Sequence, residues 1–437
     1  MTCNLFSIFI HPSSILSVSV ICVNNPKTSD ESKWSNNEFW LPPYNWIDEV
    51  RKNFDLPKRV YVHDATLREG DQHPGIAMRK DDKVALATAL DDLGVNSIEI
   101  APMISNADKE AARAIAKLGL NAKLICFTSW NTPDIDAAVE CEADGVILDF
   151  PGNPWQGKVF WGITPEQQVE KASEAIRYAK SRGLFVIALP WDDYRAPFDY
   201  LEKDYKAIVK AGADHVTLTE TYGFSLPWTT TYMVRKIREW IPGIPIEKHG
   251  HNDYGLGTGD MLAAVSAGAE VVQTTMCGIG ERAGNAATEE VAVAIELLLG
   301  VKTGIDLKKI YRTAQLFQDI TGYTVAPTKP IIGKNIFNIT SGWVAWMKAR
   351  AREAGKPTGM VPFMPDVIGA PPQDYIIGKG SGRGLIRMRL DQLGLKVSDP
   401  QLDAVTERVK EESMLRRRAL SDNELVWITS EIQQQKT

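Results

Sequence analysis

Eight short runs rich in β-branched and aromatic residues recur along the chain, and each precedes a stretch with helical periodicity. The runs span residues 59–66, 97–101, 122–127, 145–150, 184–190, 215–220, 244–251 and 270–276. Strand–helix alternation predicts right-handed crossovers and a parallel sheet. Eight units over roughly 240 residues match a closed (β/α)₈ barrel, the TIM-barrel form of the α/β class. A doubly wound open sheet is the alternative, although no GxGxxG follows the first run.

Pattern divides the 437 residues into three parts. Residues 1–57 form an N-terminal extension that we expect to be partly disordered. Its apolar start lacks the basic opening of a signal peptide, and HPSS interrupts it as a membrane span, so a targeting role is only the alternative. Residues 58–305 are the predicted catalytic barrel. Residues 306–437 predict a mainly helical C-terminal subdomain with Gly/Pro-rich loops that could act as a lid over the barrel mouth.

Charge and cysteine usage restrict the partners. The net charge is -6, the pI is about 5.7, and no basic stripe stands out, which argues against nucleic acid. The cysteines are scattered and form no CxxC, so we expect neither a disulfide framework nor a thiolate zinc site. A cytoplasmic protein with small-molecule partners, and no membrane partner, is the resulting expectation. The five cysteines are Cys3, Cys22, Cys126, Cys141 and Cys277.

Two of the six histidines, His249 and His251, stand one residue apart at the end of the seventh run. In a strand, residues i and i+2 point to the same face, and TIM-barrel active sites lie at the C-terminal ends of the strands. Glu69, after the first run, adds a carboxylate there. The three side chains form a mixed N/O set suited to a divalent ion such as Mg, Mn, Zn or Fe. The alternative is a pair of hydrogen-bonded structural histidines.

Other polar residues are expected at the same end of the barrel because they also follow a predicted strand. They are His63, Asp64, Thr66, Arg68, Glu99, Asp149, Thr219, Glu220, Thr221, Asn252, Asp253, Glu281, Arg282 and Asn285.

Several sequence motifs at the C-terminal ends of the predicted strands resemble those of one known family. DATLREGDQ (64–72), TETYGF (219–224), HGHNDYGLG (249–257), GIGERAGNAATEE (278–290) and GKGSGRG (378–384) are similar, in order, to motifs of the isopropylmalate synthase and homocitrate synthase family. That family belongs to the metal-dependent barrel superfamily that includes hydroxymethylglutaryl-CoA lyase. The resemblance implies an acyltransferase that condenses acetyl-CoA with a 2-oxoacid on a divalent metal ion, and it implies a homodimer.

The resemblance also implies roles for individual residues. Arg68 would stabilise the negative charge that develops on the 2-oxoacid oxygen. The implied metal ligands are Glu69, His249, His251 and Asn285, and the Glu at position 69 resembles homocitrate synthases more than isopropylmalate synthases. Gln72 and Thr221 match family positions that line the 2-oxoacid site. Glu99, Thr219 and Arg282, at the ends of predicted strands, complete the expected substrate-binding set.

The chain departs from the family pattern where acetyl-CoA chemistry is expected. Ile339 and Val344 replace the two histidines of the family's HESGIH segment, and Gly380 replaces the His of GKHSG. Trp191 stands where the family has a catalytic Glu, within PWDDYR (190–195). The metal and oxoacid half of the site is therefore retained, and the acetyl-CoA half is rebuilt.

Three explanations follow from these departures. A divergent synthase would use another base, for which Asp192, Asp193 and Tyr222 are the candidates. The acyl donor or acceptor could differ. A lyase or aldolase reaction could use the same metal site, with Cys277 as a candidate catalytic residue, although a buried packing role is the alternative for that thiol. A metal-binding scaffold without activity is a further alternative.

Overall fold

The eight predicted runs form one closed, all-parallel barrel in the computed structural model, which describes residues 30–372 and 374–434. The strands follow chain order, and the last pairs with the first, with Tyr61 opposite Val271 and Asp64 opposite Thr274. The predicted TIM barrel is confirmed, because the sheet has no open edge. The strands are β1 (Tyr61–Asp64), β2 (Ser97–Ile100), β3 (Lys123–Ser129), β4 (Gly145–Pro151), β5 (Phe185–Trp191), β6 (His215–Glu220), β7 (Ile246–Gly250) and β8 (Val271–Thr274).

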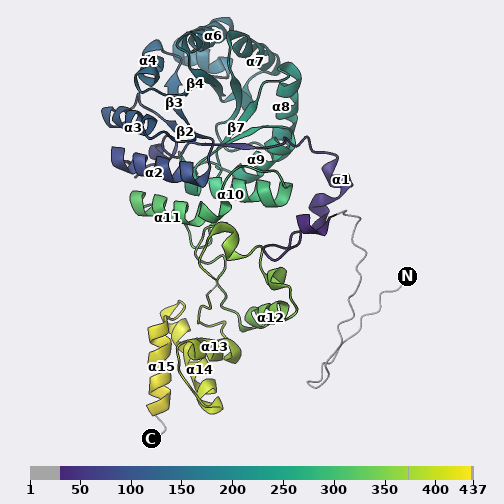
Figure 1. Ribbon diagram of the computed structural model, residues 1–437, viewed down its shortest axis with the longest axis vertical. Coiled ribbons are helices and arrows are strands. Elements are labelled where there is room, and N and C mark those ends of the chain that lie inside the picture. The colour runs from purple at the N-terminus through teal and green to yellow at the C-terminus, as the bar shows by residue number, and fades with distance from the viewer. Residues whose placement is uncertain (1–29, 373, 435–437) are drawn as a thin grey trace, which may run out of the picture.

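Helices surround the barrel and cover the outer face of its strands (Figure 1). Their apolar faces pack on the sheet, as in α2, where Leu86, Leu90 and Leu93 are buried. These helices are α2 (Lys80–Leu93), α3 (Asn106–Ala116), α4 (Thr132–Glu140), α6 (Pro165–Ser181), α7 (Phe198–Ala211), α8 (Pro227–Trp240), α9 (Gly257–Ser266) and α10 (Thr288–Ala294), with a short α5 (Pro154–Gln156) before α6.

The end of α2 shows how tightly these units pack. Gly94 follows the helix with a φ of 101°, in the left-handed region that favours glycine. A Cβ at this position would lie 2.4 Å from the carbonyl oxygen of Gly304. Both the turn and the close backbone approach therefore require glycine.

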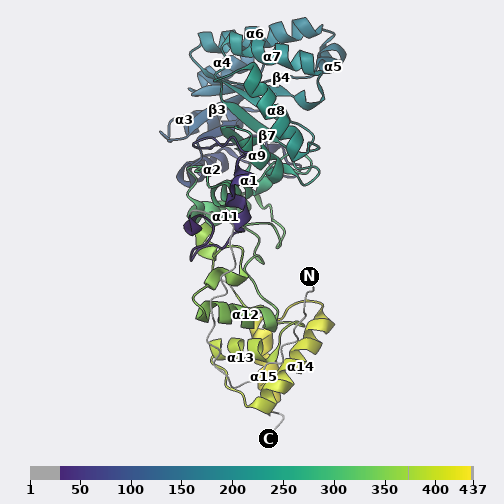
Figure 2. The same cartoon turned by 90° about the vertical axis from the view of Figure 1, so that its right-hand side faces the viewer.

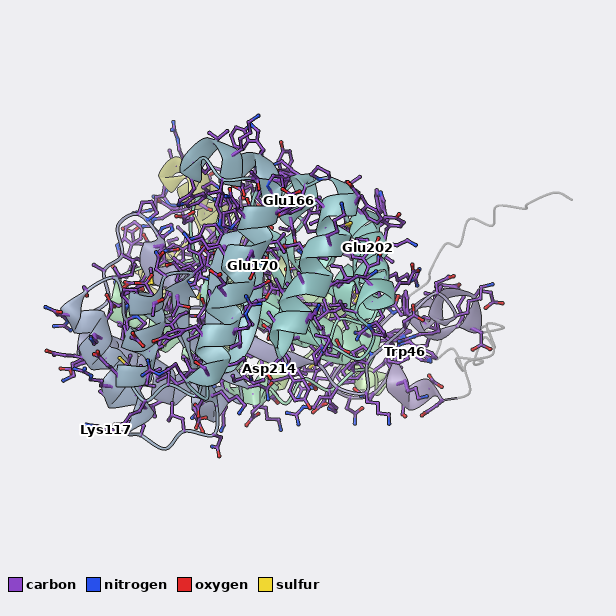
Figure 3. The ribbon with its side chains drawn as sticks, turned by 90° about the horizontal axis from the view of Figure 1, so that it is seen from above. Trp46, Lys117, Glu166, Glu170, Glu202 and Asp214 are labelled. Atoms are coloured by element: carbon purple, nitrogen blue, oxygen red, sulfur yellow. The ribbon has the colours of Figure 1, made fainter. Side chains whose placement is uncertain are left out.

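The outer surface of the barrel is charged. Figure 3 shows α6 and α7 side by side, with Glu166 and Glu170 on α6 and Glu202 on α7. Glu166 and Glu170 are exposed, whereas Ala172, Ile176 and Ala179 of α6 are buried. This two-faced pattern is what the sequence predicts for a barrel helix.

Residues 30–57 pack beside the barrel and include α1 (Asp48–Arg51). Arg51 donates from Nη1 to the Leu299 carbonyl at 2.8 Å and lies over the Trp46 ring at 4.1 Å. The first 29 residues, with Cys3 and Cys22, lie outside the described residues, and the expected disorder there is not assessed by the structure. In the described part of the chain, no helix is both long and apolar enough to cross a membrane.

The C-terminal part is helical, as the sequence predicts. After α11 (Ile310–Thr321), which packs on α2, the chain leaves the barrel and forms α12 (Gly342–Glu353), α13 (Arg383–Gln392), α14 (Asp399–Arg416) and α15 (Asp422–Gln434). Figures 1 and 2 show these last helices as a lobe that projects from one side of the barrel. The lobe has its own apolar core, which includes Leu390, Val405 and Leu425.

Candidate metal centre

Three side chains converge at the mouth of the barrel. Glu69 follows β1, and His249 and His251 lie in and directly after β7. The Nε2 atoms of His249 and His251 lie 3.7 and 3.9 Å from the two carboxylate oxygens of Glu69. One ligand atom from each residue lies within 4.8 Å of the others, and all three residues are buried. Two histidines and one carboxylate in this arrangement can share a single metal ion.

Each imidazole turns its Nδ1 to an acceptor and its Nε2 toward Glu69. Nδ1 of His249 lies 3.1 Å from Oε1 of Gln273, and Nδ1 of His251 lies 3.4 Å from the carbonyl oxygen of Glu220. A carbonyl oxygen can only accept, so Nδ1 carries the proton and Nε2 keeps its lone pair. Burial lowers the pKa of His249 to about 3, helped by the neighbouring His251, and burial also lowers the pKa of His251. Both histidines are therefore neutral, which is the form that binds metal.

Two atoms at the centre of this cluster have no hydrogen-bond partner among the described residues. They are Nε2 of His251 and Oε2 of Glu69. A buried polar atom left unpaired costs about 1–3 kcal/mol. A cation between the three side chains would satisfy both atoms, so the donor set fits a divalent ion such as Mg, Mn or Zn.

Arg68 is held beside the cluster by two carboxylates. Its Nη1 contacts Oε1 of Glu69, and its Nε donates to Oε1 of Glu99 at 2.6 Å. Burial alone would raise the pKa of Glu69, but the positive charge of Arg68 opposes burial and the pKa is lowered. Glu69 is therefore ionised, and the guanidinium is fixed in one orientation.

Alternating charges continue from Arg68 into the barrel interior. Nε2 of His63 lies 3.3 Å from Glu99, and its Nδ1 lies 3.2 Å from Glu247. Glu247 also contacts Nδ1 of His215 at 2.7 Å. Burial lowers the pKa of His63, but Glu247 and Glu99 outweigh it and raise that pKa to about 9. His63 is thus an imidazolium between two carboxylates. This charge ladder, made of Arg68, Glu99, His63, Glu247 and His215, holds Arg68 in place from the barrel interior.

A cavity of about 240 Å³ lies over the Glu69–His249–His251 cluster, which is called the metal cluster below. Seven of the predicted site residues line it, namely Arg68, Glu69, Gln72, Thr219, Thr221, His249 and His251. Glu99 stands behind Arg68 and does not line the cavity. Asp149 and Glu281 also line it, and burial raises the pKa of Asp149 to about 7, with Arg68 opposing. Among the described residues, none after Glu281 lines this cavity, so the expected lid contacts are not made within this single chain.

The two acidic base candidates on β5 and its loop face other partners. Asp192, in the left-handed region with φ 63°, accepts from Arg195 at 2.6 Å and from Gln156 at 2.6 Å. Asp193 accepts from the Tyr205 hydroxyl at 2.7 Å and from the backbone N–H of Thr219 at 3.1 Å. Neither residue lines the cavity. Asp192 therefore ties the segment after β5 to α5, and Asp193 ties it to α7 and β6.

Tyr222 and Arg282 also lie outside the cavity lining. Tyr222 stacks on Phe224 with the ring centroids 5.8 Å apart. Arg282 donates to Asp253 at 2.9 Å and to the Thr221 carbonyl at 2.6 Å. The guanidinium of Arg282 therefore fixes the loop that carries Thr221.

Asn285 and Cys277 line a second cavity of about 180 Å³ on the other side of the loop after β8. The backbone of Asn285 pairs with that of His251, and its amide donates to the Ile279 carbonyl at 3.3 Å. Asn285 therefore supports the loop beside the Glu69–His249–His251 cluster. Cys277 is buried, and burial raises its thiol pKa well above the usual range.

Three residues of the site, Gln273, Phe127 and Leu189, are not predicted from the sequence, whereas Trp191 is noted there as a departure from the family pattern. Gln273 on β8 contacts His249, and Phe127, Leu189 and Trp191 form an apolar wall of the cavity. Phe127 on β3 shares the inward face of that strand with Ile125, and Leu189 and Trp191 share one face of β5. That period-two alternation was the available signal.

The closed barrel and the three side chains at its mouth define the class of protein: a TIM barrel with a candidate site for one metal ion. Residues 59–317 match the HMGL-like family model, and the chain belongs to this family. The predicted resemblance to isopropylmalate and homocitrate synthases is confirmed by relatives that share about a third of their residues with this chain.

Three of these relatives are named as synthases of three different products. A homocitrate synthase of Methanopyrus kandleri is 35% identical over 84% of this chain and 90% of its own length. A probable 2-isopropylmalate synthase of Ignicoccus hospitalis is 37% identical over 82% and 88%. An (R)-citramalate synthase of Methanocaldococcus jannaschii is 36% identical over 85% and 74%.

Solved structures agree with the fold. An HMG-CoA lyase of Pseudomonas aeruginosa superposes with a TM-score of 0.57 at 18% identity, over 64% of this chain and 98% of its own. An HMG-CoA lyase of Bacillus subtilis gives 0.56 at 19% identity, over 62% and 96%. At this identity the likeness establishes the barrel and nothing about the reaction.

Proposed function

We propose that the protein is a metal-dependent acyltransferase that condenses acetyl-CoA with a 2-oxoacid in a Claisen-type reaction. The observation that carries this proposal is the Glu69–His249–His251 cluster beside Arg68, in a chain whose relatives are homocitrate, 2-isopropylmalate and citramalate synthases. A divalent ion held by these three side chains, whether Mg, Mn or Zn, supplies Lewis-acid polarisation of the keto group.

Arg68 provides a fixed positive charge for the oxoacid. Glu69 and Glu99 hold its Nη1 and Nε, so the guanidinium needs no reorganisation when negative charge develops on a bound oxygen. Thr219, whose buried hydroxyl has no hydrogen-bond partner among the described residues, is available to the substrate carboxylate, and Gln72 lines the same cavity. These residues bind and orient the acid.

Asp149 is the proposed acceptor of the acetyl proton. Its carboxylate lines the cavity, and no hydrogen bond contributes to its pKa. Burial raises that pKa to about 7, which is the range that suits a general base at neutral pH. Asp192 and Asp193 are committed to Arg195 and Tyr205, so Asp149 replaces them as the first candidate.

The lyase alternative has weaker support. Its candidate Cys277 is buried beside the second cavity and does not line the one over the metal cluster. A buried thiol with a raised pKa is a poor acid–base catalyst at neutral pH.

Finer features of the proposal concern partners and location. We expect small-molecule substrates, no nucleic-acid or membrane partner, a homodimer and a cytoplasmic location. The three described cysteines, Cys126, Cys141 and Cys277, are free and buried, which suits a reducing compartment.

Release of free thiol from acetyl-CoA tests the proposal. Purified protein with Mg or Mn and a panel of 2-oxoacids is expected to release thiol with at least one acid, and Glu69→Ala or His249→Ala is expected to abolish release. The proposal would be contradicted if both variants released thiol at the wild-type rate. Cleavage of a hydroxyacyl-CoA without any condensation would also contradict it.

A further inference from the structure

The interior of the barrel is divided into a charged half and an apolar half. His63, Glu99, Glu247, His249 and Gln273 project inward from β1, β2, β7 and β8 and bond one another. The opposite strands carry an apolar cluster inside the barrel. Its residues on β3, β4 and β5 are Ile125, Phe127, Ile147, Phe185, Ile187, Leu189 and Trp191.

The apolar half reaches the cavity over the metal cluster. Phe127, Leu189 and Trp191 line that cavity on its apolar side, whereas Glu69, His249 and His251 line the polar side. The register places the carboxyl group of Asp149 beside this wall, because Phe127 pairs with Ile147 on β4 and Leu189 pairs with Asp149, which shares the face of Ile147. A substrate whose polar end faces the metal cluster therefore presents its side chain to this wall.

The cavity offers positive charge to only one carboxylate. Of its lining residues, all within the described part of the chain, Arg68 is the single cation, and it is already bonded to Glu69 and Glu99. The remaining charged or acidic groups are Glu69, Asp149 and Glu281. Whether Asp149 is ionised or protonated, it supplies no positive charge. A second carboxylate on the apolar side would lose water without gaining a cation, which is costly.

We infer that the acceptor is a monocarboxylic 2-oxoacid with an apolar side chain, seated on Phe127, Leu189 and Trp191, and that the cavity rejects 2-oxodicarboxylates. This inference rests on the proposed function. It separates the chain from its relative named homocitrate synthase. Rejection of 2-oxodicarboxylates follows from the lack of a second cation in the cavity lining, and the preference for a bulky apolar side chain follows from the apolar wall.

The test compares kcat/KM for thiol release with five acids at fixed metal and acetyl-CoA. The acids are 2-oxoisovalerate, 4-methyl-2-oxopentanoate, pyruvate, 2-oxoglutarate and oxaloacetate. We expect a branched acid to exceed pyruvate by about tenfold, since added methylenes in an apolar pocket discriminate by that order or more. It should exceed either dicarboxylate by a larger factor, about 100-fold. Fastest turnover of a dicarboxylate would overturn the inference while the proposed function stands.

A paired substitution checks that the wall decides the outcome. Leu189→Arg places a cation on the apolar wall and should shift the ratio of 2-oxoglutarate to 2-oxoisovalerate turnover by at least tenfold toward the dicarboxylate. Leu189→Met conserves volume and keeps the wall apolar, so it should still turn over 2-oxoisovalerate faster than 2-oxoglutarate. If the buried Arg prevents folding, Trp191→Arg at the half-buried end of β5 serves the same purpose. A ratio that stays constant in the folded Arg variant overturns the inference.

A binding experiment distinguishes failure of the proposed function from failure of this inference. If no acid releases thiol, calorimetric titration of the Mn-loaded protein with the same acids still measures the acceptor preference. Tighter binding of branched monocarboxylates than of dicarboxylates would uphold the inference alone. Equal or reversed affinities would overturn it as well.

Discussion

Gln273 on β8 holds His249 on β7 through a contact of 3.1 Å between its Oε1 and the imidazole Nδ1. Its amide cannot turn over, because Nε2 donates to Glu247 at 2.8 Å and to Thr217 at 3.2 Å. A carboxylate accepts only, so the amide nitrogen must face Glu247 and the amide oxygen must face His249. The proton of His249 is therefore kept on Nδ1, and Nε2 remains free for a metal ion.

Replacing Gln273 by Met should weaken metal binding by about 10–100-fold, the usual effect of losing the group that orients a ligating histidine. Calorimetry with Mn²⁺ measures the affinity, and ¹⁵N shifts of the labelled His249 ring report which nitrogen carries the proton. Gln318→Met, on the partly buried face of α11, is the matched control and should leave both readouts unchanged. Wild-type affinity in a folded Gln273→Met protein would contradict the assigned contact.

Metal addition should stabilise the protein through the Glu69 cluster. An ion at 100 times its Kd adds about 2.7 kcal/mol to the free energy of unfolding. Thermal melts with and without Mn²⁺ should therefore separate in the wild type and coincide in Glu69→Gln, which removes the charged ligand. Equal stabilisation of both proteins would place the ion elsewhere.

The rate should depend on pH through Asp149. A base with a pKa of about 7 is protonated and inactive in acid, so kcat/KM should rise as pH increases through 7 and level off above it. Asp149→Asn should lower kcat by about 10²–10⁴-fold and remove this rise. The metal affinity of the variant serves as the control. A wild-type rate in Asp149→Asn would assign the base to another residue.

Stability should fall in alkali through His63. The pKa of this group rises from 6.5 to about 9 in the folded protein, which corresponds to about 3 kcal/mol. Because the folded pKa is raised, the contribution is complete below 6.5 and is lost as pH rises from 6.5 through 9. Urea unfolding at pH 6 and pH 9.5 measures the loss.

A His63→Leu variant provides the comparison. It leaves Glu99 and Glu247 buried around a neutral side chain, so it should be less stable than wild type at pH 6 by about 3–5 kcal/mol. The difference should shrink at pH 9.5. A constant gap across this range would mean that His63 does not carry the charge of the ladder.

The linear order of residues determined the architecture and the metal half of the site. Eight strand–helix units can bury their apolar faces in a closed parallel barrel, and the alternation of side chains along a strand places His249 and His251 on one face. Arg68 and Glu69 follow directly from the first strand. These predictions needed only local periodicity and a rule about strand ends.

Tertiary structure decided what each acidic or aromatic residue contacts. Asp192 and Asp193 looked like bases in the sequence, yet Arg195 and Tyr205 bind them away from the cavity. Gln273 and Leu189 carried no motif, yet barrel closure brings one against His249 and the other into the cavity wall. Such contacts depend on the register between strands far apart in the chain, and spacing along one strand does not encode it.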